Sequence, residues 1–515
     1  MIKEKFANIC SRISSLMFAA MFLFLPFTSF PLISKLFGGA SVAPLSVLPA
    51  FILVILLVLP NVIRRQYFSI QFKPLLLFFL FSILSTFLVF FRDTPSFRDT
   101  HFLNNALESV VTLLIGFSFY YLCSHFLTSE EKIKNVLKWM NIGAFVLIAF
   151  SFLQILYIRT PLDDYPAWLR KLTYLISSVG MVFPRRISGL AFEPSWLAHQ
   201  LNILYLPVWL GFSLKGYSIY KTRILKRITI ENILLLFGIL MLFLSFSKIG
   251  WITFGFLIVY ILIRVVRSIY YKTVQRLETK QNKKFTKAQS FILKMFTWLI
   301  VLLISIIMAV IAAKVMAWLD PKRSADLLNF KALKERGLYS WANLLRIAER
   351  LVYWTIGFRT FQIHPWFGVG LGAVGYYFAS TIPAFGYKLP DLVHIFNYEN
   401  FIPNAKNIWA RLLSETGIIG TAFFISWIYL QWKASVELDN NKHSVPYQAF
   451  GLVGKLSVIA FIFEGFSMDT FGLPYYWVAF GLVVAAWRIL KNTQLDEISV
   501  VDENPIAQID KTVID

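Results

Sequence analysis

Apolar stretches of about 20 residues recur along the whole chain and alternate with polar segments. A helix of that length crosses the hydrocarbon core of a bilayer, where the backbone must satisfy its own hydrogen bonds. We therefore predict an all-α, polytopic integral membrane protein of about twelve transmembrane helices. The predicted spans are residues 16–36, 42–60, 74–91, 107–126, 139–158, 196–214, 230–246, 251–266, 292–315, 408–432, 447–466 and 474–490.

The composition supports this class, because 57% of the residues are hydrophobic, only 15% are charged, and the mean hydropathy is +0.64. Soluble globular domains carry about 25% charged residues. The two cysteines, Cys10 and Cys123, indicate neither a metal cluster nor a disulfide pattern.

Lysine and arginine residues gather in the short loops on one side of the predicted membrane, which predicts that these loops are cytoplasmic. With an even number of spans, both termini are then cytoplasmic. Most of the net charge of +22 falls in these loops, where it would meet anionic lipid headgroups, and we expect no nucleic-acid binding. The strongly basic segment 268–289 is predicted to be an interfacial helix that fixes the topology.

The pattern divides the chain into a membrane domain, residues 1–490, and an acidic tail, residues 491–515, which we predict to be cytoplasmic and disordered. Two long polar loops, residues 159–195 and 316–407, would lie on the extracytoplasmic side, and both are rich in arginine and lysine. We expect the second loop to fold into short helices over a cavity.

Cations outside the cytoplasm call for an anionic partner. A guanidinium offers a planar set of donors that fits pairs of phosphate oxygens, so arginines from both loops could clamp a diphosphate. The structural alternative is that they meet lipid headgroups or loop carboxylates. We predict neither metal nor cofactor, although Asp163 and Asp164 form an adjacent carboxylate pair in the first loop.

Three motifs follow one another in and beside these loops. Residues 186–195 read Arg-Ile-Ser-Gly-Leu-Ala-Phe-Glu-Pro-Ser, residues 350–372 begin with Arg-Leu-Val-Tyr-Trp and end with His-Pro-Trp-Phe-Gly-Val-Gly-Leu-Gly, and residues 407–420 read Asn-Ile-Trp-Ala-Arg-Leu-Leu-Ser-Glu-Thr-Gly-Ile-Ile-Gly. In order and spacing they resemble the motifs of the superfamily of bacterial O-antigen polymerases and O-antigen ligases. The resemblance covers residues 183–420.

This resemblance implies a glycosyltransferase C-like membrane enzyme in the bacterial plasma membrane, with an extracytoplasmic active site. It implies a polyprenyl-diphosphate-linked glycan as donor and acceptor, transfer without a metal, and membrane lipids, a chain-length regulator and a flippase as partners. One departure favours a polymerase. The ligase branch usually has histidine before the asparagine of the third motif, where this chain has Lys406 before Asn407.

Transfer from a lipid diphosphate requires positive charge at the leaving group and a proton acceptor at the attacking hydroxyl. Arg186 and Arg350 are the leading candidates for phosphate ligands, with Arg185 and Arg346 as second choices. Arg346 and Arg350 would share one face if their segment is helical.

The candidates for activating the acceptor are Glu193, Glu399, His394 and Lys406. The structural alternatives are a helix N-terminal position for Glu193 and a surface position for His394. Lys406 could instead bind phosphate or the acceptor glycan.

Asn407 and Arg411 complete the predicted substrate-binding residues. Arg411 is also placed to pair with Glu415, because a buried carboxylate in a span needs a partner. For His364 and the following glycine turn we predict a structural role.

Two further functions remain open. A ligase would transfer a finished glycan to a lipid A core or a protein with the same donor chemistry. A lipid-linked glycan transporter would also suit twelve helices with internal arginines, but the sequence shows no pair of similar halves.

Overall fold

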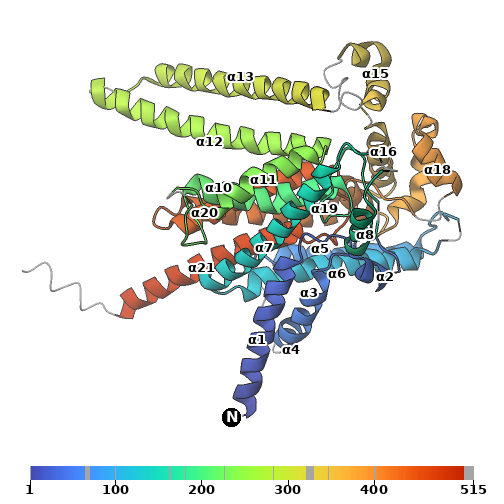
Figure 1. Ribbon diagram of the computed structural model, residues 1–515, viewed down its shortest axis with the longest axis horizontal. Helices are drawn as coiled ribbons and strands as arrows, with labels where there is room; N and C mark the ends of the chain where they lie inside the picture. The colour runs from blue at the N-terminus through green and yellow to red at the C-terminus, as the bar shows by residue number, and fades with distance from the viewer. Residues whose placement is uncertain are drawn as a thin grey trace, which may run out of the picture.

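The computed structural model describes residues 2–36, 38–63, 70–98, 100–161, 164–179, 181–224, 227–281, 284–319, 330–345, 347–398 and 402–503. Throughout these ranges the regular structure is helical, and the only β-type pairings are two isolated bridges. Figure 1 shows long helices gathered into one bundle, with short helices at one end. The prediction of an all-α fold is confirmed.

The long helices form the bundle and its edges. They are α1 (Ile2–Leu23), α5 (Lys73–Leu88), α6 (Phe102–Phe126), α7 (Glu130–Leu156), α11 (Ile230–Leu244), α12 (Lys248–Gln281), α13 (Lys287–Leu319), α19 (Ile408–Asn440), α20 (Val445–Glu464) and α21 (Tyr475–Glu503).

Shorter elements connect them or extend them. The α-helical ones are α2 (Pro31–Leu36), α3 (Val47–Leu53), α4 (Leu59–Ile63), α8 (Ala167–Ile176), α9 (Pro194–Gln200), α10 (Leu206–Lys215), α15 (Phe330–Leu344), α16 (Ala348–Ile363), α17 (Phe378–Thr381) and α18 (Pro390–Tyr398). Two π-helical turns, η1 (Val54–Val58) and η3 (Leu201–Tyr205), and three 3-10 turns, η2 (Val89–Phe91), η5 (Val374–Tyr377) and η6 (Ala384–Lys388), complete the set.

In the described ranges, seven helices are long and apolar enough to cross a membrane, and three shorter apolar helices lie at residues 8–23, 47–63 and 230–244. These helices support the predicted membrane protein. The number of twelve spans stays a prediction, because several apolar stretches are divided among shorter elements.

The core of the bundle lies where α6, α10, α19, α20 and α21 pack together. Trp427 and Trp477 are fully buried there, with ring centroids 5.1 Å apart. Gly116 of α6 leaves room for the Trp477 ring, since a Cβ at this glycine would lie 2.2 Å from the indole nitrogen. Small residues thus let these helices approach closely, as is typical of membrane bundles.

The predicted span 16–36 is wrong as a single helix. α1 ends at Leu23, and α2 begins only at Pro31. Pro26 supplies no backbone N–H and cannot continue a helix, and the chain instead pairs with a later segment, with Phe30 N donating to Ala43 O at 2.7 Å.

Two other segments differ from the sequence prediction. The basic segment 268–289 forms no separate helix, because α12 continues to Gln281 and α13 begins at Lys287, and the two helices make the long hairpin seen at the edge of Figure 1. Its interfacial position stays a prediction. α21 continues to Glu503, so the predicted tail begins as helix. The rest of the tail lies outside the described residues.

Candidate active site

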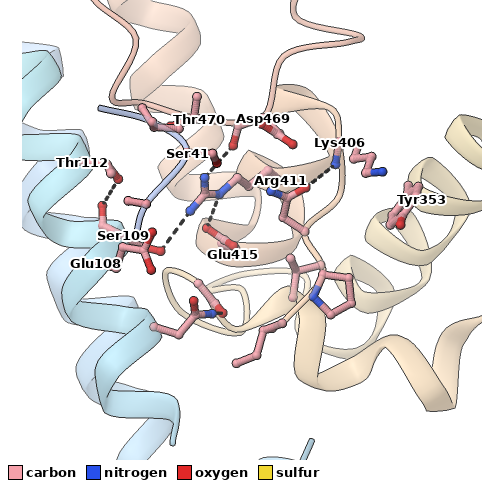
Figure 2. Close-up of a pocket in the computed structure, with 18 of the residues that line it drawn as sticks. Ser41, Glu108, Ser109, Thr112, Tyr353, Lys406, Arg411, Glu415, Asp469 and Thr470 are labelled. Atoms are coloured by element: carbon pink, nitrogen blue, oxygen red, sulfur yellow. Dashed lines mark hydrogen bonds and ion pairs between the residues drawn. The ribbon is translucent and has the colours of Figure 1, made fainter. Parts of the chain in front are cut away.

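A cavity of about 920 Å³ lies at one end of the bundle, beside the start of α6 and the start of α19. Figure 2 shows a close-up of the residues that line it. Its walls come from the start of α6, the start of α9, α16, the start of α19 and the loop between α20 and α21, with residues 40–42 and 402–406 at the rim. Drug-sized ligand pockets are about 300–1,000 Å³. The cavity is therefore large enough for several sugar rings or for a diphosphate with its first sugar.

A break in α19 shapes the floor of this cavity. Gly417 has a φ of +62°, and the helical hydrogen bonds lost there are replaced by bonds to the glycine turn that follows α16. The N–H of Gly370 donates to Glu415 O at 2.9 Å, and that of Ile418 donates to Pro365 O at 2.8 Å. The glycine turn after His364 therefore supplies hydrogen bonds at the helix break, and this explains the motif by a structural role.

Arg411 is the central charged residue of the floor. Its Nε donates to Glu415 Oε2 at 2.9 Å, its Nη1 to Asp469 O at 2.6 Å, and its Nη2 to Ser109 Oγ at 3.1 Å. Figure 2 shows Arg411 between α6 and the loop that carries Asp469. The predicted pair of Arg411 with Glu415 is confirmed. Arg411 joins three elements, and each of its nitrogens already has an acceptor.

Arg350 and Lys406 line the cavity with donors to spare. Arg350 Nη1 donates to the hydroxyl of Ser467, and in the described residues its Nε and Nη2 meet no acceptor. The Lys406 Nζ lies 4.4 Å from the centre of the Tyr353 ring and has no hydrogen-bond acceptor among the described side chains. Both cations can therefore receive an anionic ligand.

Glu193 lies at the N-terminus of α9 and faces the cavity. Its side chain makes no capping hydrogen bond with the helix backbone, and it accepts a bond from the Ser195 hydroxyl instead. Pro194, at the first helical position, has no N–H to cap. The carboxylate therefore remains available to a ligand.

Arg186 and Arg185, by contrast, do not line this cavity. Arg186 Nε donates to Ser245 O at 2.9 Å, and both arginines border a separate small pocket beside Tyr157 and Tyr165. The expected clamp of Arg186 with Arg350 is therefore wrong in its geometry, because the two side chains lie in different pockets.

The other predicted residues are placed as follows. His394, on α18, is exposed and lies outside the cavity lining. Asn407 is the N-cap of α19, where its Oδ1 accepts from the N–H groups of Trp409 and Ala410, so its side chain is used structurally. Arg346 and Glu399 lie outside the described residues, as does Asp163. The helix face expected for Arg346 and Arg350 therefore also involves a residue outside the described ranges.

A polar stripe on the first turns of α6 and the two residues before it was not predicted. Seven polar residues at spacings of three to four reach the cavity: Thr100, His101, Asn104, Asn105, Glu108, Ser109 and Thr112. The stripe was missed because the predicted span began at residue 107, while the helix begins at Phe102. Helical spacing of polar residues just before an apolar run was the available signal.

Asp469, in the loop between α20 and α21, was also missed, although it is the one carboxylate of a short polar interruption between two apolar spans. The walls of the cavity thus carry three carboxylates, those of Glu108, Glu193 and Asp469, and the floor carries a fourth, that of Glu415. The lining of the cavity therefore combines the cations Arg350 and Lys406 with several carboxylates, amides and hydroxyls.

A buried brace lies directly behind the cavity. His199 Nδ1 and Glu464 Oε2 are 2.6 Å apart, and Asn202 Nδ2 donates to Glu464 Oε1 at 2.5 Å. His199 belongs to the helix that starts at Glu193, and Glu464 ends the helix that leads to Ser467. The brace therefore holds two walls of the cavity together.

Fold and site together define a helical membrane protein with a charged cavity at one end of its bundle. Residues 233–425 match the family model described as O-Antigen ligase, a range that contains Arg350, Lys406 and Arg411. This match supports the O-antigen ligase and polymerase superfamily, and with it a glycosyltransferase-like enzyme of polysaccharide assembly, without distinguishing the two branches. A comparison with curated proteins finds no match.

Proposed function

We propose that this chain polymerises polyprenyl-diphosphate-linked oligosaccharide repeat units on the outer face of the bacterial plasma membrane. The observation that carries the proposal is that one cavity is lined both by cations with donors left over, Arg350 and Lys406, and by carboxylates and neutral polar groups. Glycosyl transfer from a lipid diphosphate needs both.

On the donor side, Arg350 and Lys406 would hold the diphosphate. As the anomeric C–O bond breaks, negative charge grows on the leaving phosphate oxygen, and donors aimed at that oxygen stabilise the transition state more than the ground state. A charge-assisted hydrogen bond contributes about 1.5–3 kcal/mol, so two such groups lower the barrier by several kcal/mol. Arg411, whose donors are used, would hold the floor in place.

On the acceptor side, Glu193 would take the proton of the attacking sugar hydroxyl. Its carboxylate lines the cavity and keeps capacity to accept, because among the described residues it accepts only from the Ser195 hydroxyl. Glu108 and Asp469 are the alternatives on the neighbouring walls. The amides and hydroxyls of α6 would then bind the hydroxyl groups of the acceptor sugar.

A ligase is the second candidate, and the specific observation in its favour is the match to the O-Antigen ligase model. Lys406 stands where the ligase branch usually has histidine. Its side chain lines the cavity, and its ammonium group has no hydrogen-bond acceptor among the described side chains. An ammonium group suits phosphate binding better than proton removal, and the polymerase is therefore the better supported reading.

The test supplies the purified, reconstituted chain with lipid-linked repeat units alone and separates the products by size. A polymerase gives a ladder of longer lipid-linked glycans, and Glu193→Gln should lose the ladder while substrate binding persists. Products that appear only after lipid A core or a protein is added would assign a ligase. Movement of the labelled lipid across the bilayer with no new glycosidic bond would assign a transporter.

A further inference from the structure

Three cations surround one carboxylate at the end of the bundle opposite the cavity. Lys215 Nζ lies 3.0 Å from Asp439 Oδ1, and Lys455 Nζ lies 2.6 Å from Asp439 Oδ2. Arg264 adds two hydrogen bonds to the same carboxylate, at 2.6 and 3.2 Å. Asp439 follows the break at Gly417 by 22 residues of α19, about 33 Å of helix. This cationic cluster is therefore separate from the proposed active site.

The cluster carries excess positive charge. Three positive charges and one negative charge give a net charge of +2. In the described part of the chain, Asp439 is the single carboxylate within ion-pairing distance of the three cations. Positive charge that is partly removed from water and not balanced by the protein is costly unless an anion approaches.

The cluster also keeps donors for such an anion. The Lys455 side chain is only 9% exposed, and Asp439 is the single acceptor that its ammonium group meets among the described residues. Two of its three N–H bonds are thus left over. Lys215 gives one further bond to Gln448 Oε1 and keeps a third N–H.

The position of the cluster points to a lipid and not to a soluble ligand. It lies where α10 and α19 end and where the apolar first half of α12 gives way to its basic second half, and Arg264 is the most exposed of the three cations at 31%. The Arg264 guanidinium lies 6.0 Å from the Tyr260 ring, which in turn lies beside Trp432. Tyrosine and tryptophan gather at the headgroup level of a bilayer, and basic pockets between helices at that level suit anionic headgroups.

We infer that Lys215, Arg264 and Lys455 form a binding site for the phosphate of an anionic phospholipid headgroup in the leaflet next to this end of the bundle. Asp439 holds the three cations together and lowers their mutual repulsion. The inference is independent of the proposed glycosyl transfer.

The test is native mass spectrometry of the full chain in detergent, titrated with phosphatidylglycerol and, separately, with phosphatidylcholine. The wild-type chain should retain phosphatidylglycerol at least tenfold more tightly. Lys455→Met removes one charge of the cluster and should weaken phosphatidylglycerol binding by about fivefold with little change for phosphatidylcholine.

Lys491→Met is the matched control. Lys491 lies near the same end of the bundle, is 42% exposed, and pairs with Glu437 at 3.2 Å, so its loss should leave phosphatidylglycerol binding unchanged. Equal binding of the two lipids, or equal losses in Lys455→Met and Lys491→Met, would overturn the inference. Displacement of phosphatidylglycerol by millimolar inorganic phosphate would overturn the lipid assignment in favour of a soluble anion.

Discussion

Arg350 shows how much depends on which donors of a side chain are already used. Its Nη1 is fixed by Ser467, so the guanidinium is oriented, yet Nε and Nη2 have no acceptor among the described residues. Arg411 follows Lys406 in the chain, and each of its three nitrogens donates to an acceptor. The first is suited to bind a ligand and the second to hold the site together.

Arg350→Lys should lower the rate of glycan transfer by about 10- to 100-fold, because a lysine cannot keep the Ser467 contact and also offer a planar pair of donors. The measurement is the rate of product formation in proteoliposomes. Arg359→Lys is the matched control, because Arg359 lies on the same helix but donates to Thr381 O at 3.0 Å, away from the cavity. Equal activity of wild type and Arg350→Lys would remove Arg350 from the site.

At the scale of single residues, the sequence indicated which residues are candidates for the site better than it indicated where their side chains lie. Arg350, Lys406 and Glu193 were selected by charge and motif, and all three line one cavity. Arg186 was selected for the same reasons and lies in another pocket, because a motif indicates which residues are unusual and not which way a loop turns. Asp469 was overlooked since it stands alone in a short connection.

Among the elements, α19 contributes most to the shape of the cavity floor. Its break at Gly417 lets the glycine turn of residues 364–372 replace the lost helical hydrogen bonds, which fixes Arg411 and Glu415 in the cavity floor. The sequence indicated a helix from residue 408 and a glycine-rich turn after His364, but not that the two segments pair. That pairing joins residues about 50 positions apart, and hydrophobic periodicity contains no information about it.

Gly417→Ala should destabilise the protein by about 2 kcal/mol or more, because an L-residue at positive φ costs about 1–2 kcal/mol and the added methyl group would collide with backbone. A Cβ at Gly417 would lie 2.3 Å from Trp366 O. The measurement is the thermal unfolding midpoint in detergent.

Gly255→Ala provides the comparison. Gly255 lies inside α12 with nothing within 4 Å of an added Cβ, so its replacement should be neutral or slightly stabilising. If both alanine variants unfold at the wild-type temperature, the break in α19 does not depend on glycine.

For the molecule as a whole, composition alone predicted a helical membrane protein, because so apolar a chain has no other stable solution in a bilayer. The element boundaries were less accurate. Pro26 ends α1 inside a predicted span, and α12 runs well beyond the apolar stretch that indicated it. Hydropathy indicates which stretches can lie in lipid. A helix, however, can continue into water as long as its backbone hydrogen bonds are made.

Stability should also depend on pH through His364. Burial, and then the nearby Arg92 charge, lower the pKa of His364 from its usual value of 6.5. The unfolded chain then binds a proton more readily than the fold does, so the contribution of this residue is complete above about pH 6.5 and is lost as the pH falls further.

The measurement compares unfolding midpoints at pH 7 and pH 5. His364→Gln should lose less stability between these two values than the wild type does, whereas His443→Gln, in the exposed connection after α19, should follow the wild type. Identical pH dependence in all three proteins would contradict this assignment.

The brace of His199, Asn202 and Glu464 has a consequence for how such an enzyme could diversify. A change at any of the three would strand an uncompensated carboxylate or imidazole in an apolar interior, so the wall that carries Glu193 is costly to alter. At the start of α6, its N-cap residue His101 and the helical residues Asn104 and Glu108 are exposed to the cavity and make no hydrogen bond to other described residues. Natural variants that recognise different sugars are therefore expected to carry substitutions first along this helix. Few substitutions are expected in the wall that the brace holds.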